Sequence, residues 1–287
     1  MAAGSPSKAV LITGCSSGIG RATAERLARG GWSVYASARR AEAIADLKSA
    51  GCKTLALDVE DERSMAAAVA EIERAEGAIG VLINNAGYSQ SGAIESVPME
   101  KVRRQFETNV FGLVRLTQLI LPGMRKQRWG KIVNISSMGG KLTFPGGGFY
   151  HATKHALEAI SDALRFEVRG FGIDVVVIEP GLIRTKFGEA AVGSMHGVPS
   201  DGGPYAEFNS AVAKATAEVY EKGPLAIFGG APDAVAKVIE KALNAGHPKT
   251  RYTVTPSAKM LLGQRRLMSD GLWDAFLRTQ FPQPGKS

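Results

Sequence analysis

The sequence has little cysteine, no long apolar run and no cluster of metal-binding side chains. Its two cysteines, Cys15 and Cys52, are too few for a disulfide framework and predict a protein kept reduced in the cytoplasm. No window approaches about 18 apolar residues, so we expect no membrane span. Residues 1–8 lack the basic start and apolar segment of a secretion signal. Histidines and cysteines never occur at zinc-site spacing, so we expect no bound metal.

Positive charge is in excess but is not concentrated anywhere. The formal net charge is +8, yet the basic pairs Arg39-Arg40, Arg103-Arg104 and Arg265-Arg266 are far apart. No segment interleaves Lys and Arg with aromatic residues. This pattern is typical of a solvated basic surface, and we expect no nucleic-acid partner.

Short apolar, β-branched runs alternate with segments that have helical spacing. The expected strands are 9–12, 33–38, 54–59, 78–84, 131–135, 174–178 and 251–255. Strands that are apolar throughout are buried on both faces, and intervening helices make their sheet parallel. We therefore predict an α/β fold, a doubly wound Rossmann-type parallel sheet of seven strands with helices on both faces. It forms a single domain over residues 7–256.

Several expected helices and one insert complete this domain. We predict helices at 41–50, 61–76, 98–127, 150–169 and 233–245, with a kink or break at Pro122. Residues 186–230 contain glycines around a helix-prone middle, 205–220, and such an insert at the carboxyl end of a strand is typical of a substrate lid. Residues 257–287 predict a helical tail that packs against the domain or a second subunit, with an interfacial helix as the alternative.

A glycine-rich turn follows the first expected strand and opens a helix. It reads Thr13-Gly14-Cys15-Ser16-Ser17-Gly18-Ile19-Gly20, a G-x-x-x-G-x-G spacing. Glycines let the backbone approach a pyrophosphate, and a helix N-terminus favours that anion. We therefore predict a bound dinucleotide, with a purely structural turn as the alternative. Cys15 is interpreted as a small filler of this turn and not as a reactive thiolate.

The end of the second expected strand indicates which dinucleotide is bound. NAD sites place a carboxylate there, whereas NADP sites use arginine for the 2′-phosphate. This position holds Ala38, followed by Arg39 and Arg40, and no acidic residue occurs before Glu42. The pattern favours NADP(H) over NAD(H), although a solvated Arg39 is the alternative.

Tyr150 and Lys154 are four residues apart and project from one face of their expected helix. An ammonium there lowers the pKa of the phenol. Ser137, at a strand end thirteen residues upstream of Tyr150, can return to the same place through a glycine-rich loop. The three residues predict an acid/base, its tuning cation and a positioning hydroxyl, although such a pair in isolation is usually surface helix.

We do not expect four nearby polar residues to take part in catalysis. We interpret His151 and His155 as helix-surface or subunit-facing residues. Asn134 and Ser136 are interpreted as hydrogen-bonded polar groups at a strand end.

Together these motifs resemble the short-chain dehydrogenase/reductase family, in its single-domain NADP-type branch. The matches, in family order, are Thr13-Gly14-x-x-x-Gly18-x-Gly20, Asp58 closing the third strand, Asn84-Asn85-Ala86-Gly87, Asn109, Ser137, Tyr150-x-x-x-Lys154, Pro180-Gly181 and Thr185. The resemblance covers residues 8–185 by motif and continues to residue 256 by element order.

The resemblance implies roles for individual residues. Tyr150 would donate a proton in reduction and accept one in oxidation, while Lys154 lowers its pKa and holds the nicotinamide ribose. Ser137 would bond the substrate oxygen, and Asn109 would anchor a water linked to Lys154. The implied cofactor site comprises Gly14, Ser16, Ser17, Gly18, Ile19, Gly20, Arg39, Asp58, Val59, Asn85, Ala86, Gly87, Tyr150, Lys154, Pro180, Gly181, Ile183 and Thr185.

The predicted function is NADP(H)-dependent interconversion of a carbonyl and a secondary alcohol on a small-molecule substrate. Apolar positions in the lid and pocket predict a bulky lipophilic substrate of steroid, retinoid, acyl or aromatic ketone type: Met138, Leu142, Phe144, Phe149, Leu182, Phe187 and Tyr205. The alternatives are a non-catalytic NADP(H)-binding regulator and a sugar-nucleotide epimerase, for which too few residues follow residue 256. The resemblance also implies a homodimer or homotetramer formed through the helices at 98–127 and 150–170.

Overall fold

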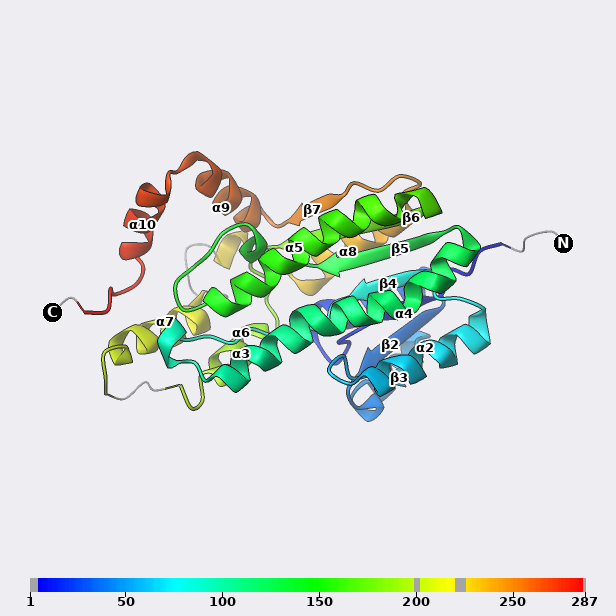
Figure 1. Ribbon diagram of the computed structural model, residues 1–287, viewed down its shortest axis with the longest axis horizontal. Coiled ribbons are helices and arrows are strands. Elements are labelled where there is room, and N and C mark those ends of the chain that lie inside the picture. Colours follow the sequence, from blue (N-terminus) through cyan, green and yellow to red (C-terminus); the bar gives the residue numbers. More distant parts are fainter. Residues whose placement is uncertain (1–4, 199–201, 220–225, 286–287) are drawn as a thin grey trace.

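The computed structural model describes residues 5–198, 202–219 and 226–285, and its centre is one parallel sheet (Figure 1). The strands run in the order β3-β2-β1-β4-β5-β6-β7. They are β1 (Val10–Ile12), β2 (Val34–Ala38), β3 (Lys53–Ala56), β4 (Val81–Asn84), β5 (Gly130–Ile135), β6 (Ile173–Pro180) and β7 (Arg251–Val254). All six neighbouring pairs are parallel, which confirms the predicted fold class.

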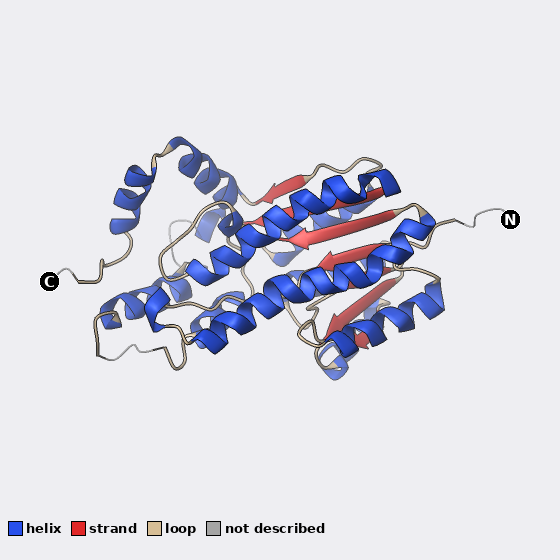
Figure 2. Cartoon of the chain, in the orientation of Figure 1, coloured by secondary structure: helices blue, strands red, loops and turns tan. Residues whose placement is uncertain are grey.

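Helices cover both faces of the sheet, as Figure 2 shows. One face carries α1 (Gly18–Arg29), the 3₁₀ segment η1 (Ala41–Ala50) and α8 (Pro232–Asn244). The other carries α2 (Glu62–Glu76), α4 (Gly112–Gln127) and α5 (Gly148–Val168). Alternation along β1 explains this arrangement, because Val10 and Ile12 pack into the first core and Leu11 into the second.

The strand order reverses beside β1, and this reversal positions the site. Val10 of β1 aligns with Val34 of β2 on one side and with Val81 of β4 on the other. The chain leaves β1 and β4 in opposite directions across the sheet, which opens a crevice at the carboxyl ends of these strands. Ligands of open α/β sheets bind in such a crevice.

The expected helix at 98–127 is interrupted, but not at the proline. It consists of α3 (Met99–Phe106), a π-helical turn η3 (Glu107–Phe111) and α4, which continues through Pro122 to Gln127. The predicted break at Pro122 is therefore wrong. Proline cannot donate to the carbonyl of Gln118, but both residues are exposed, so water can satisfy that carbonyl.

Most of the remaining elements lie at the carboxyl end of the sheet, and one short turn leads into β6 at the opposite end. They are the short turns η2 (Ile94–Ser96), η4 (Met138–Gly140), η5 (Arg169–Phe171) and η6 (Ala226–Phe228), the helices α6 (Phe187–Ser194) and α7 (Ala206–Glu218) of the predicted lid, and the tail helices α9 (Pro256–Leu267) and α10 (Asp270–Arg278). Parts of the predicted lid, residues 199–201 and 220–225, lie outside the described residues. None of the helices described is long and apolar enough to cross a bilayer.

Candidate active site

A cavity of about 950 Å³ occupies the crevice at the carboxyl ends of the strands. Its lining brings together nearly all of the predicted site residues, from the glycine-rich turn to Thr185. Gly20 and Asn109 are the exceptions, since neither lines the cavity.

The glycine-rich turn needs glycine at three positions, for two different reasons. Gly14 and Gly18 have φ angles of 72° and 60°, which other residues rarely adopt. At Gly20, a Cβ would lie 2.4 Å from Asn85 Nδ2 and 2.6 Å from the carbonyl oxygen of Gly14. Gly20 is thus required for close packing behind the turn and not for direct ligand contact.

Asn85 holds this turn in place. Its Nδ2 donates to the carbonyl oxygens of Thr13, at 2.8 Å, and of Gly14, at 3.1 Å. Thr13 Oγ1 in turn accepts from the backbone nitrogens of Asn85 and Ala86, both at 3.0 Å. These bonds join the loops after β1 and β4 into one rigid cradle.

The cradle presents the N-terminus of α1 to the cavity. Ser17 occupies the N-cap position without a side-chain hydrogen bond, and the first turn has no acidic residue. The helix dipole and free amides therefore favour an anion such as a phosphate. Cys15 is fully buried, and burial raises its pKa to about 12, so the thiol stays neutral and fills space as expected.

The two residues expected near the nucleoside differ in their surroundings. Arg39 follows β2 at the rim of the cavity, is exposed, and forms no ion pair with any described residue. Asp58 lies two residues beyond the end of β3, so it follows that strand and does not close it. Its Oδ1 accepts from the backbone nitrogen of Glu60 at 3.0 Å, which orients the carboxylate at the rim.

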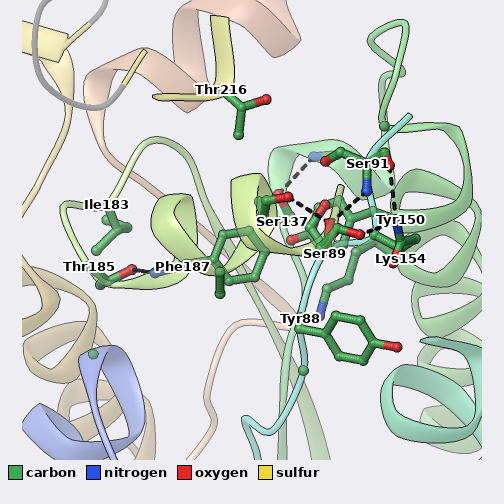
Figure 3. A pocket seen from close by; sticks show the side chains of 18 of the residues that line it. Tyr88, Ser89, Ser91, Ser137, Tyr150, Lys154, Ile183, Thr185, Phe187 and Thr216 are labelled. Atoms are coloured by element: carbon green, nitrogen blue, oxygen red, sulfur yellow. Dashed lines mark hydrogen bonds between the residues drawn. The ribbon is translucent and has the colours of Figure 1, made fainter. Parts of the chain in front are cut away.

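Ser137, Tyr150 and Lys154 meet in the cavity, as Figure 3 shows. Ser137 follows β5, and its Oγ accepts from the backbone nitrogen of Gly139 at 3.0 Å. Tyr150 and Lys154 lie one turn apart on α5, with Lys154 Nζ 5.7 Å from the centre of the Tyr150 ring. A hydroxyl, a phenol and an amine thus surround one point at the end of the sheet.

Lys154 is buried, and this changes its acidity. Nζ donates to the carbonyl oxygen of Ile135 at 2.8 Å. Burial lowers the pKa of Lys154 to about 8, opposed by the negative charge of Glu158 one turn further along α5. The amine is therefore largely protonated at pH 7, and it supplies a positive charge in a setting with little water to screen it.

Asn109 lies behind the cavity wall, in the π-helical turn. Its Nδ2 donates to the carbonyl oxygen of Tyr88, at 2.9 Å, and to Thr153 Oγ1, at 3.1 Å, while its Oδ1 accepts from the backbone nitrogen of Tyr88, at 3.1 Å. Both amide hydrogens are used, so the side chain fixes the loop after β4 against α5. Single π turns are frequent at functional sites. The water link implied for Asn109 stays a prediction.

His151 is not the surface residue that we expected. It is only 8% exposed and lines the cavity next to Tyr150, with ring centres 5.7 Å apart. Nδ1 lies 3.1 Å from the carbonyl oxygen of Gly139, and burial lowers the pKa of His151 to about 4, so the ring is neutral at pH 7. The histidine is buried because the loop after β5 folds back over this face of α5. His155 is exposed, as expected.

The two polar residues at the end of β5 differ from each other. Asn134 is hydrogen-bonded to Asn84 and Ser161, both at 2.9 Å, as expected. Ser136 is buried, but its Oγ has no hydrogen-bond partner among the described residues, so the expectation for Ser136 is wrong. The side chain points into the tight space beside Gly140, where a Cβ at position 140 would lie 2.8 Å from the Ser136 oxygen.

The apolar lining was only partly predicted. Of the expected residues, Met138, Phe144, Leu182 and Phe187 line the cavity. Leu142, Phe149 and Tyr205 do not line it, although each packs in an apolar cluster. The structure adds lining residues that were not predicted: Ser89, Gln90 and Ser91 after β4, Val212, Ala215, Thr216 and Val219 on or after α7, and Leu261, Phe276, Gln280 and Phe281 in the tail.

Fold and site together define a class of protein, the single-domain α/β oxidoreductases with a Ser-Tyr-Lys site at the end of the sheet. The chain belongs to the short chain dehydrogenase family, because the sequence pattern of that family matches residues 8–194. This confirms the predicted family and the prediction that the protein is an enzyme.

Individual relatives agree with this assignment. The chain is 39% identical over 277 residues to the NADPH-dependent 3-dehydrocapnine reductase of Ornithobacterium rhinotracheale, covering 92% of this chain and 94% of that protein. It is 44% identical over 179 residues to the 3-ketodihydrosphingosine reductase of Bacteroides thetaiotaomicron, covering 62% and 65%. A short-chain dehydrogenase from Streptomyces avermitilis superposes with a TM-score of 0.78 at 34% identity, covering 95% of this chain and 96% of that one.

Proposed function

We propose that this oxidoreductase uses NADP(H) to interconvert a carbonyl and a secondary alcohol on a lipophilic small molecule, with Tyr150 as general acid and base. One observation carries the proposal: Ser137, Tyr150 and Lys154 line a single cavity next to the glycine-rich turn, with the Lys154 ammonium 5.7 Å from the Tyr150 ring centre. Proton transfer to an alkoxide needs an acid of this kind, held beside a cation.

The residues of the cradle fit a nicotinamide dinucleotide. Gly14 and Gly18 allow close backbone approach, and the uncapped N-terminus of α1 favours a pyrophosphate. Arg39, which has no acidic partner among the residues described, suits a 2′-phosphate, and Asp58 lies at the same rim. Such a cofactor, when bound, supplies the hydride.

Side chains of the protein itself bind the substrate oxygen and transfer the proton to and from it. Ser137 Oγ donates a hydrogen bond to that oxygen and orients the carbonyl. Charge develops on the oxygen as the carbonyl carbon is reduced, and the phenol of Tyr150 then transfers its proton to it. Lys154 stabilises the resulting phenolate, and the reverse sequence operates in alcohol oxidation.

The relatives and the lining support the finer points of the proposal. One relative is described as NADPH-dependent, and two are reductases of 3-dehydrocapnine and 3-ketodihydrosphingosine. The apolar side chains of Met138, Phe144 and Phe187 suit a lipophilic substrate. A non-catalytic regulator has no need of Ser137, Tyr150 and Lys154 in one cavity.

Replacing Tyr150 with phenylalanine tests the mechanism. The substitution removes only the phenolic oxygen, so ketone reduction should fall about a hundredfold or more. NADPH affinity, measured by nicotinamide fluorescence, should stay close to that of the native protein. Turnover equal to that of the native enzyme would contradict the role of Tyr150.

A further inference from the structure

The far end of the cavity is built by parts of the chain that follow the region matched by the family. The glycine-rich turn, Ser137, Tyr150 and Lys154 all lie within residues 8–194. Apart from His196, the lining beyond residue 194 comes from α7, from the residue that follows it and from the tail. Most of it is apolar: Val212, Ala215, Val219, Leu261, Phe276 and Phe281, with His196, Thr216 and Gln280 as the polar exceptions. Figure 3 shows Thr216 of α7 across the cavity from Lys154.

A buried tryptophan holds the tail against the domain. Trp273 of α10 is 4% exposed and packs with Leu142 and Leu261. Its Nε1 donates to the carbonyl oxygen of Thr143 at 3.3 Å. The Trp273 ring lies 5.2 Å from the ring of Phe276, centre to centre, so this anchor also positions Phe276 at the cavity.

Phe281 joins the tail to the lid. Although it follows α10, it packs against the apolar cluster that Phe208 and Val212 of α7 form with Ala93. Both Phe281 and Val212 line the cavity, so the tail and α7 together close it on the side of α7. This side therefore presents aromatic and aliphatic carbon to whatever extends from the catalytic residues.

We propose that Phe276 and Phe281 form the wall against which the alkyl chain of a long-chain ketone packs, and that Phe281 sets the longest chain accepted. The proposal rests on the proposed function, because Ser137 and Tyr150 must hold the carbonyl. Once that carbon is fixed, the chain can extend only into the remaining space. Each methylene buried against the wall in the transition state should raise kcat/KM by roughly fourfold until the chain reaches the wall.

The experiment is a chain-length series. Straight-chain methyl ketones of increasing length are reduced with NADPH, and kcat/KM is plotted against length for the native enzyme and for two substitutions at one position. Phe281→Ala opens the wall, so the limiting length should increase. Phe281→Trp extends the wall into the cavity, so the limiting length should decrease. Leu272→Ala, an exposed position on α10, is the matched control and should keep the native profile.

Opposite shifts cannot arise from a general loss of stability, and thermal unfolding of each variant checks this directly. If the enzyme is active and depends on Tyr150, but both variants keep the native limiting length, then Phe281 does not set that length. The proposed function would still stand. A native profile with no dependence on chain length would lead to the same conclusion. If the native protein reduces no ketone with NADPH or NADH, the proposed function is wrong and the wall is rejected with it.

Discussion

Lys154 carries a positive charge in a place that water hardly reaches. Its amine is held by the carbonyl oxygen of Ile135 and lies beside the ring of Tyr150. Desolvation lowers the pKa of Lys154 to about 8, and the carboxylate of Glu158 raises it. The charge is thus retained at neutral pH but is lost at a moderately alkaline pH, well below the usual pKa of lysine.

This acidity predicts a pH dependence. A lysine whose pKa lies near 8 is protonated below that pH and neutral above it, and ketone reduction depends on the protonated form. The rate of reduction should therefore fall as the pH rises through about 8. In Glu158→Gln the pKa of Lys154 should be lower, because the opposing charge is gone, and the falling limb should move to lower pH.

Initial rates between pH 6 and about 10 test this expectation. Glu167→Gln, which removes an exposed carboxylate from the same helix, is the control and should leave the limb in place. Glu158 also pairs with Lys141 and Arg251, so thermal unfolding of each variant should accompany the rates. If the reduction rate of Glu158→Gln falls over the same pH range as that of the native enzyme, Glu158 does not raise the pKa of Lys154.

A second prediction at this scale concerns cofactor choice. Arg39 is exposed at the rim of the cavity, with no described acidic partner to compete with a phosphate. A charge-assisted hydrogen bond to phosphate is worth enough that Arg39→Ala should weaken NADPH binding by about tenfold or more, with NADH binding unchanged. Arg40→Ala is the matched control, since Arg40 does not line the cavity. Equal native affinity for NADPH and NADH would refute the preference for NADP(H).

At the scale of elements, a buried lysine links β5 to α8. Lys131 is 4% exposed, and its Nζ donates to the carbonyl oxygens of Leu243 at 3.0 Å and Ala245 at 2.5 Å. These carbonyls belong to the C-terminal end of α8, where a cation is favourable and the oxygens have no helical partner. Burial lowers the pKa of Lys131, because surroundings with little water disfavour the charged form.

Replacing Lys131 with methionine should therefore weaken the fold. The methionine keeps the apolar stem but leaves buried carbonyls without a donor, which costs about 1–3 kcal/mol in the free energy of unfolding. Urea unfolding measures this value, and Lys126→Met, at an exposed lysine on α4, should be close to neutral. A Lys131→Met protein as stable as the native one would show that water replaces the ammonium at this helix end.

Local sequence patterns predict some helices and strands better than others. The strands and most helices were predicted within a few residues, because apolar runs and helical spacing are local signals. The π-helical turn at Glu107–Phe111 was not, since an extra residue in one turn leaves the apolar spacing of the flanking helices nearly intact. The continuation of α4 through Pro122 depends on solvent exposure, which the one-dimensional pattern does not report.

At the scale of the whole molecule, two aromatic side chains remain exposed on the long helices of one layer. Phe166 of α5 is 87% exposed, and Phe111, between α3 and α4, is 53% exposed. Covering such a side chain with a second subunit would remove apolar surface from water, which favours association. Both side chains lie on the helices through which the family resemblance implies pairing of subunits.

We therefore expect a dimer or a tetramer in solution. Phe166→Glu should shift the sedimentation coefficient toward that of the monomer, because it places a charge where apolar surface would be buried. Leu272→Glu alters an exposed apolar residue of the tail and should leave the assembly unchanged. A native protein that sediments as a monomer over the whole concentration range would contradict this expectation.

The sequence alone determined the sheet and the family, and it supplied the residues of the proposed chemistry. Each rests on short motifs whose meaning is local: a glycine-rich turn between strand and helix, and a tyrosine and lysine one helical turn apart. Such motifs can be recognised in the sequence without knowledge of the fold, because neighbouring residues and backbone geometry define them.

Only the tertiary structure decided which residues share the cavity. It buried His151 under the loop after β5, placed Gly20 and Asn109 outside the cavity lining, and brought Phe276 and Phe281 to the cavity. These outcomes depend on contacts between segments far apart in the chain; Trp273, for example, bonds to Thr143. Packing of this kind follows from the shape of the assembled core, and no local pattern of residues encodes it.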